Sequence, residues 1–221
     1  MSMKVNPERR LRAIKLVRAL KKEYPFPKSE LVHQTPFQFV VAVMLSAQCT
    51  DKLVNKVTEK LFRKYKTAAD FAALKPPELA AQIASVSFFR NKAKAVVGTA
   101  HIIATCHKGR VPRDESALQE CPGIGYKTAH VIVGELFDHW PGIPTDTHVK
   151  RFARKFDLTD NTDLKKISKD LEVLIPQKDW KYVNNGLVLY GRYICKARKH
   201  DCSDHLLTKA WPPAGNRWPR V

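Results

Sequence analysis

The chain has 221 residues, 44% of them hydrophobic, so it can form one large domain or two compact ones and is not expected to be disordered. A total of 39 Lys and Arg against 21 Asp and Glu gives a net charge of +18, which favours a polyanionic partner because neutralised phosphates release counterions. We find neither a run of about 18 apolar residues nor a hydrophobic N-terminal leader, so we expect an intracellular protein without a membrane span. Five scattered cysteines, an odd number, argue against a secreted disulfide-bonded domain.

Helical signals dominate the chain, whereas the alternation that marks strands is nearly absent. Pro7 opens a basic helix that closes near Tyr24. Its expected buried side carries Leu11, Ile14, Val17 and Leu20. The segment from Phe37 to about Gln48 is apolar nearly all round and predicts a buried helix, and Asp51 stands where the next helix would have its N-cap. Further helices are expected over residues 68–74, 76–84, 91–105, 116–120, 126–137, 145–155, 163–174 and 180–194.

The segment Pro-Gly-Ile-Pro at residues 141–144 is the best candidate boundary between two lobes. We therefore predict an all-α fold with two helical lobes. The central lobe would span residues 29–142 and contain a helix-hairpin-helix motif over residues 116–137. The second lobe would combine residues 1–28 with residues 143–221, because a lone N-terminal helix cannot bury its apolar face.

The hairpin of this motif is the most informative local feature. Two glycines at alternate positions, Gly123 and Gly125, are expected to allow left-handed turns and close approach of the backbone to a ligand. The helix that starts at Tyr126 would point free backbone N–H groups outward, where a phosphate can bind. In so basic a chain, we expect Gly123, Ile124, Gly125 and Tyr126 to hold nucleic-acid phosphates without reading the sequence of bases.

Two alternatives to this interpretation stay open. A bare Gly-x-Gly is most often an ordinary turn between two packed helices. The run Gly125-Tyr126-Lys127-Thr128 also resembles a nucleotide-binding P-loop. That motif requires glycine directly before Lys-Thr and a strand upstream, however, and neither is present.

Lys127 and Asp146 are the expected catalytic pair. A neutral Lys127 amine in the first turn of the helix could attack C1′ of a deoxyribose and form a Schiff base, and we expect a closed pocket to desolvate it. Asp146, within the segment 144–148, could stabilise cationic sugar character and shuttle protons. The bland alternatives are a solvated surface lysine and a carboxylate that caps the following helix. His148 is expected to be a packed or hydrogen-bonding residue rather than a catalyst.

Four segments resemble the endonuclease III family of the helix-hairpin-helix DNA glycosylases: residues 45–51, 121–130, 144–148 and 190–195. The resemblance implies two α-helical lobes with the active site in the cleft between them. It also implies a bifunctional enzyme that removes a damaged base, usually an oxidised pyrimidine, and then cleaves the strand by β-elimination. Lys127 falls on the nucleophile of the family and Asp146 on its catalytic aspartate.

The same resemblance assigns two residues to the opening of the duplex. Gln48 falls on the glutamine that fills the gap left by the flipped nucleotide. Phe88 occupies the place where bacterial relatives usually carry an aliphatic wedge, and an aromatic ring there could still enter the base stack. Alternatively, Phe88 is a core residue with Phe89 as its packing partner.

The cysteine loop departs from the family pattern Cys-x6-Cys-x2-Cys-x5-Cys, which holds a [4Fe–4S] cluster. Cys195 and Cys202 match the first two positions, but His205 and Trp211 stand at the third and fourth. Because four thiolates are usually required and tryptophan cannot ligate iron, we expect neither a cluster nor any other metal or cofactor. Zinc held by Cys195, Cys202, His205 and His200 is the alternative, although no clear fourth ligand stands at standard spacing.

The sequence therefore predicts a DNA glycosylase and AP lyase of base excision repair, acting as a monomer on double-stranded DNA with damaged bases or abasic sites. A non-catalytic helix-hairpin-helix DNA-binding protein is one alternative, but it would have no need of both Lys127 and Asp146. A glycosylase of different lesion specificity is another. A monofunctional adenine-mismatch glycosylase is disfavoured, because that branch lacks the lysine and carries an additional C-terminal domain.

Overall fold

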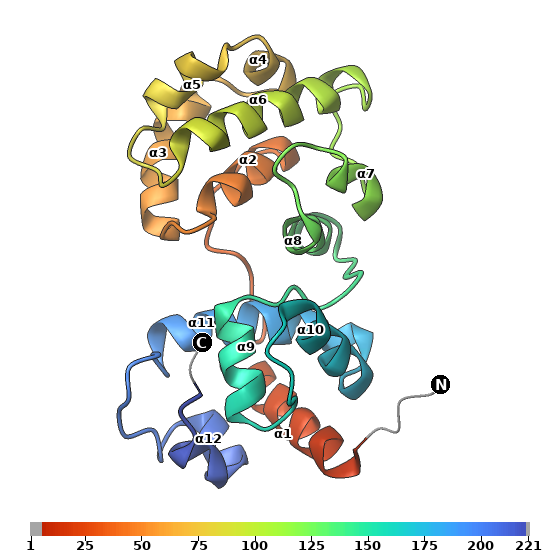
Figure 1. The fold of residues 1–221 in the computed structure, drawn as a ribbon, viewed down its shortest axis with the longest axis vertical. Coiled ribbons are helices and arrows are strands. Elements are labelled where there is room, and N and C mark those ends of the chain that lie inside the picture. The colour runs from red at the N-terminus through yellow and green to blue at the C-terminus, as the bar shows by residue number, and fades with distance from the viewer. Residues whose placement is uncertain (1–5, 220–221) are drawn as a thin grey trace. The chain divides into compact units, whose positions relative to one another are not determined.

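A computed structural model describes residues 6–219. These residues form helices and connecting loops with no strand among them, which confirms the all-α prediction (Figure 1). The chain divides into two compact units, one made of residues 29–139 and the other of residues 1–28 and 140–221. The division falls between His139 and Trp140, just ahead of the Pro-Gly-Ile-Pro segment at 141–144.

The unit of residues 29–139 contains the helix-hairpin-helix motif. Its helices are α2 (Pro36–Ser46), α3 (Asp51–Lys64), α4 (Ala68–Ala72), α5 (Pro76–Gln82), α6 (Phe89–Thr105), α7 (Glu115–Gln119) and α8 (Tyr126–Phe137). The long α6 packs against α2, α4 and α5, while α2 also contacts α8. As its composition predicts, α2 is buried all round, since every residue from Phe37 to Leu45 is buried.

Polar side chains fix where several of these helices begin. Thr35 accepts a hydrogen bond from the Gln38 N–H at the start of α2, and Thr67 caps α4 in the same way. The expected N-cap at Asp51 is wrong by one residue. Thr50 caps α3 instead, because its hydroxyl accepts the Leu53 N–H at 3.3 Å.

The other unit contains α1 (Pro7–Glu23), α9 (Thr147–Lys155), α10 (Leu164–Leu174), α11 (Leu187–Tyr193) and α12 (Leu206–Ala210). Two short 3₁₀ helices, Gln177–Asp179 and Pro212–Asn216, are added to these. The single helix expected over residues 180–194 is replaced by a π-helical turn, Tyr182–Gly186, followed by α11. The helix α12 lies beyond the predicted elements.

Each unit has its own hydrophobic core. In α1 the buried residues include Leu16, Val17 and Leu20, whereas Leu11 and Ile14 are 56% and 42% exposed, so the expected face was partly wrong. Steps of three residues advance only about 300° around a helix, and a row with that spacing winds away from the buried side. No helix within residues 6–219 is both long and apolar enough to cross a membrane.

Candidate active site and nucleic-acid interface

The hairpin before α8 rests on α6. Gly123 has φ of +78°, in the left-handed region that favours glycine, and a Cβ there would lie 2.7 Å from Cβ of Ala95. The Thr99 hydroxyl donates a 3.0 Å hydrogen bond to the Pro122 carbonyl. A Cβ at Gly98 would lie 3.1 Å from the ring of Pro122. Small side chains on this face of α6 therefore let the hairpin lie close and fix its backbone.

Gly125 and Ile124 differ from the sequence-based expectation. Gly125 has φ of −88°, so the expected second left-handed glycine is wrong. A Cβ at Gly125 would meet no atom within 4 Å, which leaves the backbone open to a ligand. The Ile124 side chain is only 3% exposed and belongs to the core. Its predicted contact with DNA is therefore restricted to its backbone, and its side chain anchors the hairpin.

The N-cap residue of α8 is Gly125, so the helix begins without a side-chain cap. The first N–H groups of a helix have no partner within it, and the first intrahelical bond here runs from the Ala129 N–H to the Gly125 carbonyl at 2.9 Å. The aligned peptide dipoles add partial positive charge at this end. The open N-terminus of α8 is therefore suited to a phosphate group.

Lys127 lies in the first turn of α8 with its side chain exposed. The expected closed pocket is therefore not supplied by the unit that carries this lysine. The neighbouring Tyr126 ring packs on the buried His130 ring with centroids 4.1 Å apart, and His130 contacts the Glu115 carboxylate on α7. This contact joins α7 to α8, the two helices of the motif, and so stabilises the first turns of the helix that carries Lys127.

Asp146 caps α9, the structural role that the sequence left open for it. Its Oδ1 atom accepts hydrogen bonds from the His148 N–H at 2.8 Å and the Val149 N–H at 2.9 Å. Neither of these bonds uses Oδ2. Because the side chain is half-buried, the carboxylate has a fixed direction while one oxygen is left for other contacts.

His148 packs between α9 and α11. A Cβ at Gly191 would collide with Nδ1 of His148, so α11 can approach α9 this closely only with glycine at that position. Burial lowers the pKa of His148 and outweighs the opposing effect of the Asp146 carboxylate. His148 is therefore a neutral, packed residue, in line with its expected role.

Gln48 and Phe88 lie in two loops of the unit 29–139 and share an unusual backbone. Their φ angles are 55° and 56°, in the left-handed region. Such strain costs about 1–3 kcal/mol at a non-glycine residue and persists only where neighbouring structure holds it. Both side chains are exposed, Phe88 by 62%. Phe89 instead packs against the core, so the alternative of Phe88 as a core residue is wrong.

Lys92 and Cys49 fasten these two loops together, and sequence analysis missed both. The Lys92 ammonium donates to the carbonyls of Leu45 at 2.8 Å and Ala47 at 2.5 Å, at the end of α2. The Cys49 Sγ accepts the Ser87 N–H at 3.3 Å and lies 3.6 Å from the Lys92 Nζ. The loop that carries Gln48 and the loop that carries Phe88 are thus joined through one sulfur atom.

The chemistry of this clasp follows from its partial burial. Burial raises the pKa of the Cys49 thiol, but hydrogen bonds from Ser87 and the Lys92 ammonium outweigh it and bring the pKa below its usual value. Burial lowers the pKa of Lys92. The sequence does contain a signal for a buried lysine here. Lys92 is adjacent to Ala93 and four residues before Val96, on the apolar side of its helix. A lysine in that position needs acceptors within the core.

The loop after α11 contains the two cysteines of its unit, Cys195 and Cys202, which are 1% and 2% exposed. The Trp211 ring packs 6.1 Å from the Phe156 ring, with the Arg12 guanidinium 5.1 Å from its centroid. The remaining cysteines, Cys49, Cys106 and Cys121, belong to residues 29–139. This unit therefore has only two of the four thiolates that a four-cysteine [4Fe–4S] cluster requires, and such a cluster does not fit its residues.

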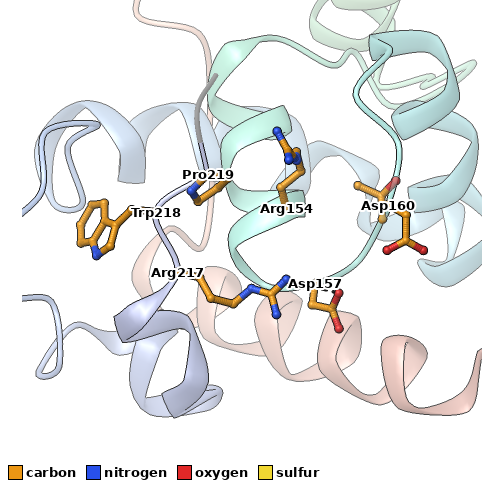
Figure 2. Close-up of a pocket in the computed structure, with 7 residues that line it drawn as sticks. Arg154, Asp157, Asp160, Arg217, Trp218 and Pro219 are labelled. Carbon is orange, nitrogen blue, oxygen red and sulfur yellow. Dashed lines mark ion pairs between the residues drawn. The ribbon is translucent and has the colours of Figure 1, made fainter.

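A polar hollow of about 380 Å³ lies in the same unit (Figure 2). It is lined by Arg154, Asp157, Thr159, Asp160, Arg217, Trp218 and Pro219. Its carboxylates already have partners, since Asp157 pairs with Arg12 at 2.8 Å and Arg217 at 3.5 Å. Asp160 pairs with Arg9 at 2.6 Å. These matched charges tie α1 to the segment after α9 and to the C-terminal segment, which gives the hollow a structural role.

Comparisons with known proteins extend this description of the site. Residues 41–177 match the family of HhH-GPD superfamily base excision DNA repair proteins. Endonuclease III of Bacillus subtilis is 42% identical over 182 residues, which cover 82% of this chain and 83% of that protein. Endonuclease III of Synechocystis sp. is 41% identical over 203 residues, covering 92% of this chain and 93% of the relative.

Solved structures give the same result. A trapped Endonuclease III–DNA covalent intermediate has a TM-score of 0.84 at 36% identity, covering 91% of this chain and 94% of that chain. A non-covalent Endonuclease III–DNA complex has a TM-score of 0.82 at 37% identity, covering 90% and 92% of the two chains. The helix-hairpin-helix, the extent of the match and the level of identity agree, and the chain therefore belongs to the endonuclease III family of the HhH-GPD superfamily of base excision DNA repair proteins.

Proposed function

We propose that this protein is a bifunctional DNA glycosylase and AP lyase that removes oxidised pyrimidines and cleaves the strand through a Schiff base on Lys127. The observation that carries the proposal is the placement of Lys127. It is an exposed amine in the first turn of an uncapped helix, directly after a hairpin with an open backbone. A relative with 36% identity has been trapped as a covalent intermediate with DNA, which supports the same chemistry here.

Binding of damaged DNA would begin at the hairpin. Backbone N–H groups at the start of α8 would hold phosphates, and the net charge of +18 would add affinity for any duplex. Gln48 and Phe88, exposed on strained loops joined by Cys49, would then enter the duplex. Phe88 would wedge between bases and Gln48 would fill the gap, which offsets the cost of extruding the damaged nucleotide.

The reaction proposed for Lys127 begins with replacement of the damaged base. The neutral amine attacks C1′, a bond forms between Nζ and C1′, and the bond from C1′ to the base breaks, so that the base leaves with a proton. Opening of the sugar ring then protonates O4′ and gives a Schiff base. Loss of a proton from C2′ expels the 3′ phosphate, which cleaves the strand. Water finally hydrolyses the Schiff base and frees Lys127.

Asp146 would serve these steps as an electrostatic and proton-transfer group. Its Oδ1 is held by two N–H groups of α9, so Oδ2 is the oxygen that would accept the proton from Lys127 and stabilise positive charge on the sugar. Since Lys127 is exposed, the bound DNA itself would exclude water from the amine. Both residues must reach the same nucleotide for this role, and variants of each test that requirement.

The proposed reaction makes no use of an iron–sulfur cluster. Cys195 and Cys202 occupy the first two of the four ligand positions, and at the fourth the Trp211 ring packs against Phe156. We expect the purified protein to lack stoichiometric iron and inorganic sulfide while it retains strand cleavage. Stoichiometric iron and sulfide in active protein would contradict this part of the proposal.

The test compares cleavage of three labelled duplexes: undamaged, with an abasic site, and with one oxidised pyrimidine. The intact protein should nick both damaged duplexes. Lys127→Ala should lose strand cleavage by about a thousandfold or more, because the nucleophile is removed. Lys60→Ala, at another exposed lysine of the same unit, should keep activity and controls for net charge. Binding of all three duplexes without any nicking by the intact protein would instead support a non-catalytic DNA-binding role.

A further inference from the structure

Three metal-binding side chains gather in the loop where the four-cysteine pattern is broken. Cys195 follows α11, His200 lies in the loop, and His205 is the N-cap residue of α12. Their ligand atoms all lie within 4.8 Å of one another. One thiolate and two imidazoles form a donor set that suits Zn²⁺ and similar divalent transition metals. The zinc alternative of the sequence analysis included these three residues together with Cys202.

Each of the two histidine rings has one buried nitrogen that could bind a metal ion. The Nδ1 of His200 lies 2.7 Å from the Arg198 carbonyl, and donation to that oxygen leaves the lone pair on Nε2. This Nε2 atom is buried and has no hydrogen-bond partner within residues 6–219. The Nδ1 of His205 is buried and unpartnered in the same range. Buried nitrogens of this kind are costly unless they find a partner, and a metal ion would supply one.

The sulfur ligand is shielded from solvent and lies in a basic environment. Cys195 is 1% exposed, and its own carbonyl accepts a 2.8 Å hydrogen bond from Arg151. The buried Lys155 donates to the Arg217 carbonyl at 3.0 Å and lies 3.7 Å from the centroid of the Trp218 ring. Burial raises the pKa of the Cys195 thiol, and the positive charges of Lys155 and Arg151 oppose this only in part. The thiolate would in turn partly offset the charge of a bound ion.

We propose that Cys195, His200 and His205 bind one divalent transition-metal ion of the Zn²⁺ class, where relatives carry the iron–sulfur cluster. The ion would link the end of α11 to the start of α12 and would replace the cross-link that the cluster provides. Cys202 is not part of the set, because its thiol is directed at the Gly215 carbonyl at 3.9 Å. Water would complete the coordination. This site replaces our sequence-based expectation of no metal and does not depend on the proposed catalytic activity.

The test is a titration of untagged, metal-stripped full-length protein with Co²⁺ and then with Zn²⁺. We expect one equivalent of Co²⁺ to bind with a thiolate-to-cobalt charge-transfer band, and Zn²⁺ to displace it. Cys195→Ser should abolish the band, and His200→Gln or His205→Gln should weaken binding at least tenfold. Zn²⁺ should raise the melting temperature of the intact protein but not that of His200→Gln. Because the His200 side chain is half-exposed, we expect this variant to fold, and circular dichroism checks that it does.

Matched controls come from the other unit. Cys106→Ser and His101→Gln change an exposed thiol and an exposed imidazole, and both should keep stoichiometric binding. The proposal is overturned if the intact protein binds no stoichiometric Co²⁺ or Zn²⁺, or if folded Cys195→Ser binds as well as the intact protein. A native protein that carries iron and inorganic sulfide in this loop would overturn it as well.

Discussion

The hairpin at residues 122–126 and the loop at residues 195–211 carry the two most characteristic motifs of the family, and they are built on different principles. The hairpin depends on backbone shape: Gly123 is left-handed and lies against Ala95 with no room for a side chain. In the family pattern, the loop depends on cysteine side chains that hold a cluster. It has exchanged two of four cysteines for His205 and Trp211.

The difference shows which kind of structure tolerates substitution. A surface that binds through backbone N–H groups is defined by φ and ψ, so a single added Cβ can destroy it. A cross-link between helices can be exchanged for another group or for packing, as the contact of Trp211 with Phe156 illustrates. We therefore expect large effects at the hairpin and at the catalytic residues, and a small effect at Cys202, the cluster-position cysteine outside the proposed metal site.

After Lys127→Ala, the largest effect that leaves the fold intact is expected for Asp146→Asn. Asparagine caps helices as well as aspartate does, so α9 and the melting temperature should be preserved. The loss of the carboxylate should reduce base excision by about 10²–10⁴-fold, the usual contribution of a group that transfers protons. Asp163→Asn, at the N-cap of α10, is the matched control and should keep full activity. Normal excision by Asp146→Asn would remove this residue from the mechanism.

Substitution of each hairpin glycine by valine should distinguish a loss of stability from a loss of DNA affinity. Gly123→Val combines a strained φ with a collision at Ala95 and should lower the free energy of unfolding by about 2–5 kcal/mol. Gly125→Val meets open space and should cost at most about 1 kcal/mol, yet weaken affinity for every duplex alike. Thermal unfolding and duplex binding at one salt concentration measure both. Equal destabilisation by the two variants would contradict the distinction drawn between these glycines.

Lys92→Met should have an intermediate effect. It leaves the carbonyls of Leu45 and Ala47 without their donor and should cost about 1–3 kcal/mol of stability. Because the loops of Gln48 and Phe88 lose their clasp, excision of a damaged base should fall more than cleavage at an abasic site, where no base has to be extruded. Lys94→Met, exposed on the same helix, controls for stability. An equal loss on both substrates would show that the clasp has no part in base extrusion.

The smallest effect is expected for Cys202→Ala. Its sulfur makes only a weak contact, 3.9 Å from the Gly215 carbonyl, so the variant should lose about 1 kcal/mol and keep strand cleavage. In a relative that holds a cluster through the matching cysteine, the same change would remove a ligand. Collapse of the unit or loss of activity in Cys202→Ala would show that this position still carries a cross-link.

Much of the fold could be predicted from the sequence because helical signals are local. Pro7 at the start of α1, the apolar run of α2 and the glycine turn before α8 are all short-range patterns. The cap formed by Asp146 is equally local, since it joins residues two and three positions apart. The left-handed φ expected at Gly125 was wrong, because a glycine can serve close approach without a positive φ.

What could not be predicted depends on contacts between distant segments. Lys92 donates to residues 45 and 47 positions away along the chain, and no periodicity indicates which helix end it will reach. The sequence indicated four candidate zinc ligands, but which three of them gather, Cys195, His200 and His205, depends on the path of an irregular loop. Gly186, in the π-helical turn Tyr182–Gly186, likewise lies against Leu20 of α1, a contact between segments far apart in the sequence.

Reduction by borohydride tests the central claim most directly. An enzyme–DNA adduct formed on a duplex with an abasic site or an oxidised pyrimidine should be trapped in stoichiometric yield and stable to denaturation. Peptide mapping by mass spectrometry should locate the modification on Lys127, and Lys127→Ala should give no adduct. Undiminished trapping by Lys127→Ala, or a modification mapped to another amine, would contradict the account.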